Sequence, residues 1–248
     1  KPIIFAFHGY PLLIHRLTAK LRDINPGLTD EGVRQAVAAL RLPLASPLID
    51  ANDTAYRLLS RWVTVEELQH GKPVGRSVRF IDFDEPKNNE FLVVEEFTMK
   101  GPRYSRRVDL VVFVNGIPIV AMECKGPGDD RGIERAVRDL LVYQEPDKGI
   151  VRLFHTVQLC MAIKRADARY GTVCTPLRRY AEWKTVYPQS RFDLERQIGR
   201  TPTKQDILLA GMLSKANLLD VVRNFMVFDR DGGKLVKKVA RYQQFEAV

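Results

Sequence analysis

Hydrophobic residues recur at helical spacing near both ends of the chain and at strand spacing between them. Residues 12–21 carry apolar side chains at helical spacing, and Thr29 can cap a second helix. Towards the other end, Thr201-Pro202 predicts the start of a helix that covers residues 207–213. Ser214 can cap a last helix after it, so helices are expected at both ends of the chain.

The middle of the chain is rich in short apolar or alternating runs, which are typical of strands. They predict strands over residues 77–83, 91–99, 109–114, 117–125, 151–157 and 159–163, with a short one near Thr172. Asn115-Gly116 is a hairpin turn, and residues 131–144 have the pattern of a helix with one apolar face. This order predicts an α/β fold with a central mixed β-sheet flanked by helices, followed by a C-terminal helical connector.

The composition is that of an ordinary globular protein with an excess of basic residues. The chain has 248 residues, 45% of them hydrophobic and 28% charged, and a formal net charge of +9. The longest apolar run, residues 111–122, contains Asn115, Gly116 and Pro118, and it is shorter than the roughly 20 residues that a bilayer requires. No membrane association is therefore expected, and the positive charge favours an anionic partner.

The cysteines and the first residues bear on location. Three cysteines without paired spacing and four scattered histidines predict neither a disulfide framework nor a zinc site. The start of the chain shows neither a signal peptide nor an initiator Met. We expect a cytoplasmic protein, of which this chain is an excised piece.

Three charged residues stand at the ends of two apolar strands. Asp109 opens one strand, whereas Glu123 and Lys125 close the next at a spacing of two, which places both on one face. Ionised groups in such apolar surroundings are costly unless they pair or bind a metal. A divalent metal held by Asp109 and Glu123, with Lys125 beside it, predicts metal-assisted hydrolysis of a phosphodiester. The alternative is a surface ion pair on an edge strand, but both strands are too apolar for a solvated face.

The two carboxylates can share an ion only if the hairpin register places them on one face. A plain two-residue loop at Asn115-Gly116 would pair Val114 with Ile117. Side-chain alternation would then leave Asp109 and Glu123 on opposite faces. A three-residue loop with Gly116 in a left-handed conformation, or a four-residue turn, makes the paired residue numbers add to an even number and restores the shared face. We predict an even register, with a positive φ at Gly116 in the three-residue case.

The segment from Arg107 to Lys125 resembles a known family. It matches the run R-P-D-x-V-x-F-V-N-G-x-P-x-x-x-x-E-x-K at Arg107, Asp109, Phe113, Asn115, Gly116, Pro118, Glu123 and Lys125. This run is similar to that of the N-terminal endonuclease region of type I restriction enzyme R (motor) subunits, in the PD-(D/E)xK nuclease superfamily. Further similar features are Asn25-Pro26, Asp82-Phe83, Asn89-x-Phe91, Trp183 and the segments 219–228 and 238–248.

The resemblance implies a restriction-endonuclease-like core and a Mg²⁺-dependent endonuclease acting on duplex DNA, a type I site-specific deoxyribonuclease. It implies Asp109, Glu123 and Lys125 as catalytic residues, and Asp109, Glu123 and the backbone carbonyl of Cys124 as metal ligands. Residues 1–184 would form the endonuclease domain with its N-terminal helices, and residues 185–248 a helical connector towards an ATPase motor. No G-x-x-x-x-G-K-[ST] phosphate loop occurs in the chain, so ATP is expected to bind only the full-length subunit. The implied partners are the methylation and specificity subunits of the restriction complex.

The chain departs from the family pattern at some positions. Val108 replaces a proline, and the family's Q-x-x-x-Y on the following helix aligns with Asp139 and Tyr143. An aspartate would repel a DNA phosphate that a glutamine could bond, and Gln144 could substitute only by slipping one position around the helix. The upstream acidic residue of the superfamily has no firm counterpart, and Glu31 is a candidate.

Four residues are candidates for contacts with DNA. Arg103, Arg106 and Arg107 precede the strand of Asp109 and could meet phosphates, which would position the duplex without sequence readout. Tyr143 is either a backbone contact or a core aromatic residue. Two other functions remain open: a non-catalytic DNA-binding or assembly module that keeps the nuclease fold, and another PD-(D/E)xK repair nuclease.

Overall fold

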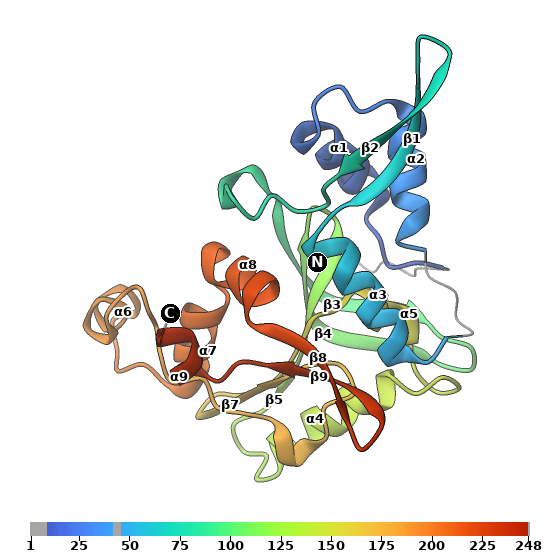
Figure 1. The fold of residues 1–248 in the computed structure, drawn as a ribbon. Helices are drawn as coiled ribbons and strands as arrows, with labels where there is room; N and C mark the ends of the chain where they lie inside the picture. Colours follow the sequence, from blue (N-terminus) through green and yellow to red (C-terminus); the bar gives the residue numbers. More distant parts are fainter. Residues whose placement is uncertain (1–8, 42–45, 248) are drawn as a thin grey trace.

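A computed structural model describes residues 9–41 and 46–247, and its centre is a five-stranded mixed sheet (Figure 1). Its strands, in spatial order, are β3 (Phe91–Lys100), β4 (Ser105–Val114), β5 (Ile117–Lys125), β6 (Leu159–Lys164) and β7 (Asp167–Gly171). Only β5 and β6 run parallel. The predicted central mixed sheet is confirmed.

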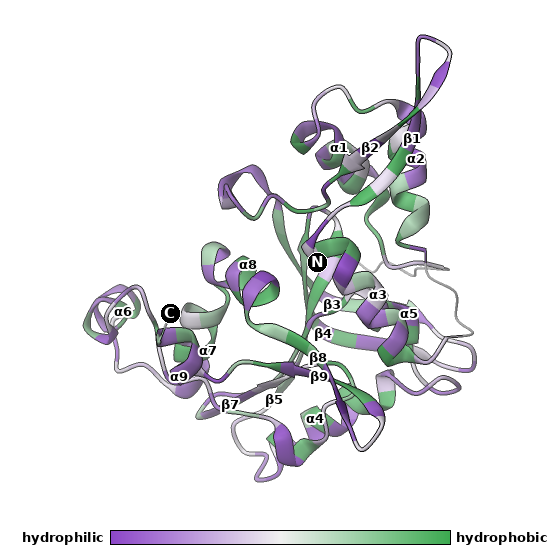
Figure 2. Ribbon diagram, viewed as in Figure 1, coloured by the Kyte–Doolittle hydropathy of each residue, from purple (hydrophilic) through white to green (hydrophobic). Residues whose placement is uncertain are grey.

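Helices cover both faces of this sheet, and the hydrophobic residues gather in its strands and in the helix faces that meet it (Figure 2). On one face lie α4 (Gly132–Tyr143) and α5 (Val151–Thr156), with α3 (Leu48–Ser60) packed on α5. A second group of helices contributes buried residues to a separate hydrophobic cluster: α1 (Ile14–Ile24), α2 (Asp30–Ala39), α7 (Lys204–Met212) and α8 (Lys215–Asn224). This arrangement is consistent with a restriction-endonuclease-like core. Within the described ranges, no helix is long and apolar enough to cross a membrane.

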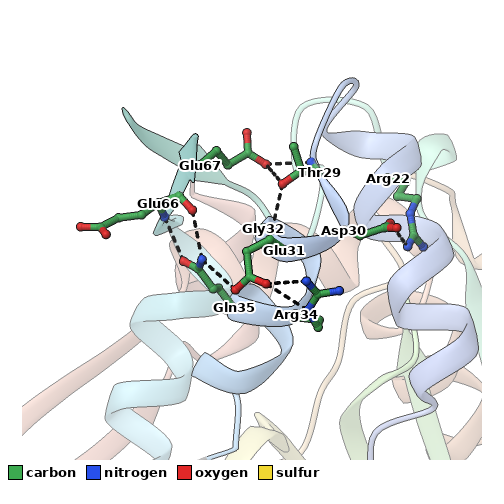
Figure 3. A network of polar contacts seen from close by, with 9 residues as sticks. All are labelled: Arg22, Thr29, Asp30, Glu31, Gly32, Arg34, Gln35, Glu66 and Glu67. Carbon is green, nitrogen blue, oxygen red and sulfur yellow. Dashed lines mark hydrogen bonds and ion pairs between the residues drawn. The ribbon is translucent and has the colours of Figure 1, made fainter. Parts of the chain in front are cut away.

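A separate hairpin, β1 (Val63–Gln69) and β2 (Lys72–Val78), projects beside α2 and was not predicted (Figure 1). Its buried Glu67 accepts hydrogen bonds from the backbone N–H (2.7 Å) and the hydroxyl (2.6 Å) of Thr29. Thr29 itself caps α2, as predicted, by accepting a hydrogen bond from the N–H of Gly32 (Figure 3). The carboxylate of Glu67 therefore fastens the hairpin to the start of α2.

The strand predicted over residues 77–83 is mostly a loop. β2 ends at Val78, and the side chain of Asn25 then bonds both backbone groups of Arg79, each at 2.9 Å. An amide side chain thus replaces the neighbouring strand that this segment would otherwise need. A short 3₁₀ helix, Pro86–Asn88, leads from this loop into β3.

The strand predicted over residues 151–157 is also wrong, because this segment forms α5. Its β-branched and aromatic residues have strand propensity, but tertiary contacts override it. The buried side chain of Asn52 in α3 donates to the carbonyls of Phe154 (2.9 Å), His155 (3.1 Å) and Val157 (2.8 Å). These carbonyls lie at the end of α5, where a helix lacks internal partners.

The C-terminal part contains the predicted helices and one unpredicted hairpin. Thr203, rather than Thr201, caps α7, and Ser214 caps α8 as predicted. The remaining elements are η2 (Leu177–Arg179), α6 (Arg191–Ile198), β8 (Met226–Asp231), β9 (Lys234–Val239) and α9 (Tyr242–Glu246). The predicted helical connector is therefore not wholly helical. It packs closely on the core, since the Trp183 ring lies 5.3 Å from that of Phe245.

The β4–β5 hairpin turns through two residues, and the predicted three-residue loop is wrong. Val114 pairs with Ile117 across the turn. Asn115 (φ 52°) and Gly116 (φ 79°) both adopt the left-handed conformation that this tight turn requires. The positive φ expected at Gly116 is thus observed, although in a different turn.

Asn115 joins this turn to the loop before β3, which explains an asparagine at this point. Its buried side chain donates to Phe80 O (2.9 Å) and Asn89 Oδ1 (2.8 Å), and it accepts from the N–H of Glu90 (2.8 Å). Asn89 in turn donates to Asp82 O (2.6 Å). Three separate parts of the family resemblance therefore form one hydrogen-bonded unit.

Substitution of Gly116 by Ala is expected to destabilise the protein more than the same change at Gly71. Both glycines have φ near 79° as second residues of tight turns, so each alanine costs roughly 1 kcal/mol of backbone strain. A Cβ on Gly116 would also lie 2.8 Å from Leu13 O and 2.9 Å from Leu17 N, whereas Gly71 faces open space. We expect Gly116→Ala to lose a further ~1–3 kcal/mol of unfolding free energy through this clash. Urea unfolding of the two variants tests this, and equal losses would contradict it.

Candidate active site

A β-bulge in β5 sets the register around the candidate site. Phe113 pairs with Pro118 and Val112 with Val120, which leaves Ile119 as the extra residue. Pro118 lacks a backbone N–H, and within a sheet proline is confined to edges, strand starts and bulges. The bulge therefore coincides with the residue that cannot complete a regular ladder.

Beyond the bulge the register is even, as predicted. Leu110 pairs with Met122, so the paired residue numbers add to 232. Continued by one position, this register would set Asp109 opposite Glu123, on one face of the sheet. The bulge, and not the length of the turn, thus brings Glu123 to the face that Asp109 requires.

Asp109 sits at an irregular point of the sheet. The pairing of β3 with β4 skips Glu96 and Asp109, and Glu96 has a positive φ of 51°. On the other side, Oδ2 of Asp109 accepts a hydrogen bond from the backbone N–H of Cys124 at 2.8 Å. The carboxylate is therefore held against β5, next to Glu123. The unusual backbone at Glu96 could not be read from the sequence pattern.

Glu123 is the most buried of the charged residues at this point. It is only 2% exposed, and its Oε2 accepts a hydrogen bond from Nζ of Lys125 at 3.1 Å. Its Oε1 is buried and has no hydrogen-bond partner among residues 9–41 and 46–247. Burial first, and then the nearby charge of Asp109, raise the pKa of Glu123 to about 7 despite the opposing effect of Lys125. An incompletely satisfied, desolvated carboxylate is typical of a functional site.

Lys125 lies between two carboxylates. Besides Glu123, its Nζ contacts Oδ2 of Asp139 on α4 at 2.6 Å. Although burial by itself would lower it, the hydrogen bonds to Asp139 and Glu123 raise the pKa of Lys125. Lys125 is therefore a charged group, fixed at the end of β5 by partners on two elements.

The four residues predicted to contact DNA differ in their exposure and in their contacts within the protein. Tyr143 donates from its hydroxyl to Arg107 O at 3.1 Å, and burial raises its pKa. The side chain of Arg107 pairs with Glu96 at 3.0 Å, and Arg106 donates to Lys148 O at 2.8 Å. Arg103 is exposed in the β3–β4 turn. Of the three arginines, Arg106 and Arg107 are thus already engaged within the protein.

Gln144, predicted as a possible substitute for the family's glutamine, and Glu31, the candidate for the upstream acidic residue, lie outside this site. Gln144 is buried, and its amide donates to Leu140 O (2.9 Å) and accepts from the N–H of Cys174 (2.7 Å), so it is not available to DNA. Glu31 is in the first turn of α2, where it bonds Arg34 and Gln35 (Figure 3). That helix packs on β1 rather than on β4 or β5.

Two carboxylates and a lysine thus converge at the middle of β4 and the end of β5, and one buried oxygen of Glu123 has no partner among the described residues. The expectation that Asp109 opens its strand is wrong, because β4 already begins at Ser105. Among the described residues, no set of three or more His, Cys, Asp or Glu side chains is arranged to hold a metal ion. A closed structural metal site is therefore not formed there. The Asp109–Glu123 pair comprises two acidic side chains, fewer than the three that such a site requires.

Comparisons with known proteins find a matching family and similar chains. The family described as "Type I restriction enzyme R protein N terminus (HSDR_N)" matches residues 8–179, more than two thirds of the chain. The "Type I restriction enzyme HindI endonuclease subunit" of Haemophilus influenzae is 30% identical over 96% of this chain. The "Putative type I restriction enzyme MjaIXP endonuclease subunit" of Methanocaldococcus jannaschii is 29% identical, also over 96%.

The chain corresponds to a limited part of these relatives. It spans 22% of the length of the Haemophilus protein and 23% of that of the Methanocaldococcus protein. The family match nevertheless includes β3 to β7 and all the residues of the candidate site. The chain therefore belongs to the family of the N-terminal region of type I restriction enzyme R proteins.

Proposed function

We propose that this chain is the DNA-cleaving domain of a type I restriction R subunit, a Mg²⁺-dependent endonuclease that hydrolyses phosphodiester bonds of unmodified duplex DNA. The convergence of Asp109, Glu123 and Lys125 on one face of the sheet is the observation that carries the proposal. Residues 1–184 form the PD-(D/E)xK endonuclease domain, and residues 185–248 lead towards an ATP-driven motor. In this proposal the protein acts in the cytoplasm, and methylation and specificity subunits select the DNA.

The residues present fit a divalent cation. The buried Oε1 of Glu123 lacks a partner, and the adjacent Asp109 makes the ionised form of Glu123 still less favourable. A cation would compensate both, and Mg²⁺ is commonly held by one or two carboxylates, with water and phosphate oxygens as its other ligands. Asp109, Glu123 and the carbonyl of Cys124 would hold it, and it would polarise the phosphate and acidify a water molecule.

The chain's own groups then have separate tasks. The hydrogen bond from the Cys124 N–H fixes the carboxylate of Asp109 against β5. Lys125 presents a positive charge beside Glu123, where it orients the attacking water and stabilises negative charge that develops on the phosphate. Burial of Glu123 strengthens its interaction with the ammonium group of Lys125.

The arginines before Asp109 would guide the DNA towards this point. Arg103 is exposed, and the Arg107–Glu96 pair is largely exposed, so a phosphate can take the place of Glu96 at little cost. Such contacts act on the backbone and carry no sequence information. This agrees with a nuclease whose target is chosen by other subunits.

Cleavage of plasmid DNA tests the proposed function directly. Supercoiled plasmid with the unmodified recognition site is incubated with the complete restriction complex and ATP, with or without Mg²⁺. The proposal expects double-strand cleavage only with Mg²⁺ and only in unmodified plasmid. Binding and ATP hydrolysis without any cleavage would instead support the non-catalytic alternative.

Mn²⁺ affinity of the chain is expected to increase with pH up to about 7. Glu123 is protonated below its raised pKa of about 7, and a metal must displace that proton. Between pH 5.5 and 7 the affinity should therefore rise by up to about tenfold per pH unit, and then level off. Calorimetric titrations with Mn²⁺ at several pH values measure this.

The Glu123→Gln variant should lose the pH dependence together with most of the affinity. Glu134→Gln on the exposed side of α4 is the matched control and should retain both. Tight Mn²⁺ binding by Glu123→Gln would place the metal at another site.

A further inference from the structure

Lys125 has two carboxylate partners, and they come from different elements. Its Nζ lies 3.1 Å from Glu123 Oε2 on its own strand and 2.6 Å from Asp139 Oδ2 on α4. The Glu123 side chain is 3% exposed, that of Lys125 22%, and that of Asp139 40%. The shorter contact is thus made by the more exposed carboxylate, which no step of the proposed hydrolysis requires.

A cation at Glu123 would compete with Lys125. Both are positive, and both need an oxygen of the same carboxylate. A lysine whose only anionic partner was Glu123 would be repelled towards solvent when the metal binds, because its four-carbon stem is flexible. A second anion within reach of Nζ, outside the metal site, removes this conflict.

Asp139 is held in position to provide that anion. The neighbouring positions of α4 are anchored on the sheet, since Ala136 and Leu140 are fully buried. One turn further along, Tyr143 is fixed by its hydrogen bond to Arg107 O. The backbone of Asp139 therefore cannot move away from Lys125 without movement of the whole helix. A neutral glutamine, which the family pattern places here, would supply no charge.

From this geometry we infer that Asp139 is a positioning residue for Lys125: it retains the ammonium group in the site while Glu123 binds the metal. The inference rests on the proposed function. Asp139 is not itself a metal ligand, because no third acidic side chain joins the Asp109–Glu123 pair among the described residues. Its effect on the metal is therefore exerted through Lys125.

A double-mutant cycle on Mn²⁺ affinity tests this in the 248-residue chain. The variants are Asp139→Asn, Lys125→Met and the double variant, and Mn²⁺ binding is measured by electron paramagnetic resonance. If Asp139 acts through Lys125, Asp139→Asn leaves the ammonium to compete for Glu123 and weakens Mn²⁺ binding about tenfold. In the Lys125→Met background the same change should weaken it less than about twofold.

Controls separate the possible outcomes. Asp130→Asn removes an exposed acid near the start of α4 and should leave the affinity unchanged. Circular dichroism melting identifies a variant that is not folded, and Lys125→Gln then replaces Lys125→Met. Equal effects of Asp139→Asn in both backgrounds would overturn the inference while leaving the metal site intact. Absence of Mn²⁺ binding by the wild-type chain would overturn the proposed site and the inference with it.

A second measurement uses the complete restriction complex. Loss of the positioning contact should lower the single-turnover cleavage rate of Asp139→Asn at least about tenfold, without weakening DNA binding. Removal of a negative charge that merely faced the DNA would instead tighten binding and leave the rate unchanged. That result would also overturn the inference.

Discussion

Substitution of Glu123 by Gln in the complete restriction complex is expected to lower the rate of DNA cleavage by more than about a hundredfold. Glutamine keeps the size of the side chain but removes the charge that would hold the metal. Lys125→Ala is expected to have a similar effect, because it removes the positive charge beside Glu123 that the proposed mechanism uses to stabilise the reacting phosphate. Cleavage of supercoiled plasmid at saturating Mg²⁺ and ATP measures both changes.

ATP hydrolysis and DNA binding by the same variants are expected to stay close to those of the wild type. We place the motor outside this chain, so a defect confined to the chemical step should spare it. Glu134→Gln changes an exposed glutamate on α4 and serves as the matched control for loss of one negative charge. Near-normal cleavage by Glu123→Gln or Lys125→Ala would refute the assignment of the active site.

The stability of the chain is expected to rise between pH 7 and pH 10 because of Lys237. This lysine of β9 is 6% exposed, and its Nζ donates to Asn52 Oδ1 at 2.9 Å and to Gln158 Oε1. The rings of Tyr56 and Phe228 lie 5.2 Å and 5.1 Å from Nζ. Burial lowers its pKa to about 7.

The free energy of unfolding should rise with pH because the folded and unfolded states bind different numbers of protons. Between pH 7 and about pH 10 the unfolded chain keeps this lysine protonated, whereas the folded protein has lost the proton. The unfolded state therefore binds more protons, and the free energy of unfolding increases with pH by up to about 1.4 kcal/mol per unit. Below pH 7 both states are protonated, and this contribution to the pH dependence disappears.

Urea unfolding at several pH values tests this with two variants. Lys237→Met removes the titrating amine. The difference in the free energy of unfolding between wild type and variant should therefore change by about 1.4 kcal/mol per pH unit from pH 7 to 10. Lys234→Met changes an exposed residue of the same strand, and its free energy of unfolding should depend on pH as that of the wild type does. Parallel curves for Lys237→Met would show that the amine keeps its ordinary pKa in the fold.

Features that depend on neighbouring residues could be predicted from the sequence. The strand from Ile117 to Lys125 was predicted with its observed bounds, because its apolar run lies between a tight turn and a Gly-Pro-Gly break. The caps at Thr29 and Ser214 also act within one helical turn. The charged triad was identified for a similar reason, since ionised residues in apolar strands require a partner wherever those strands lie.

Local sequence predicted that the hairpin register is even, but not the feature that makes it even. The requirement for an even register follows from the chemistry of two carboxylates, but a bulge in β5 provides it rather than a longer turn. Pro118 lies in a central strand, where a proline indicates a bulge. A two-residue turn is compatible with an even register because the bulge shifts the following residues of β5, including Glu123, by one position.

Local sequence thus accounts for the local chemistry of this protein: a mixed α/β core, a hairpin that carries Asp109 and Glu123, and a family resemblance that spans most of the chain. Contacts between distant segments, in contrast, make residues 151–156 a helix, bring Asp139 to Lys125 and bury Lys237 against Asn52 and Gln158. Each of these depends on a partner far away in the chain, such as Asn52 for the carbonyls at the end of α5. Local propensity cannot contain such information, because the decisive energies are those of desolvation and hydrogen bonding that arise when distant segments meet.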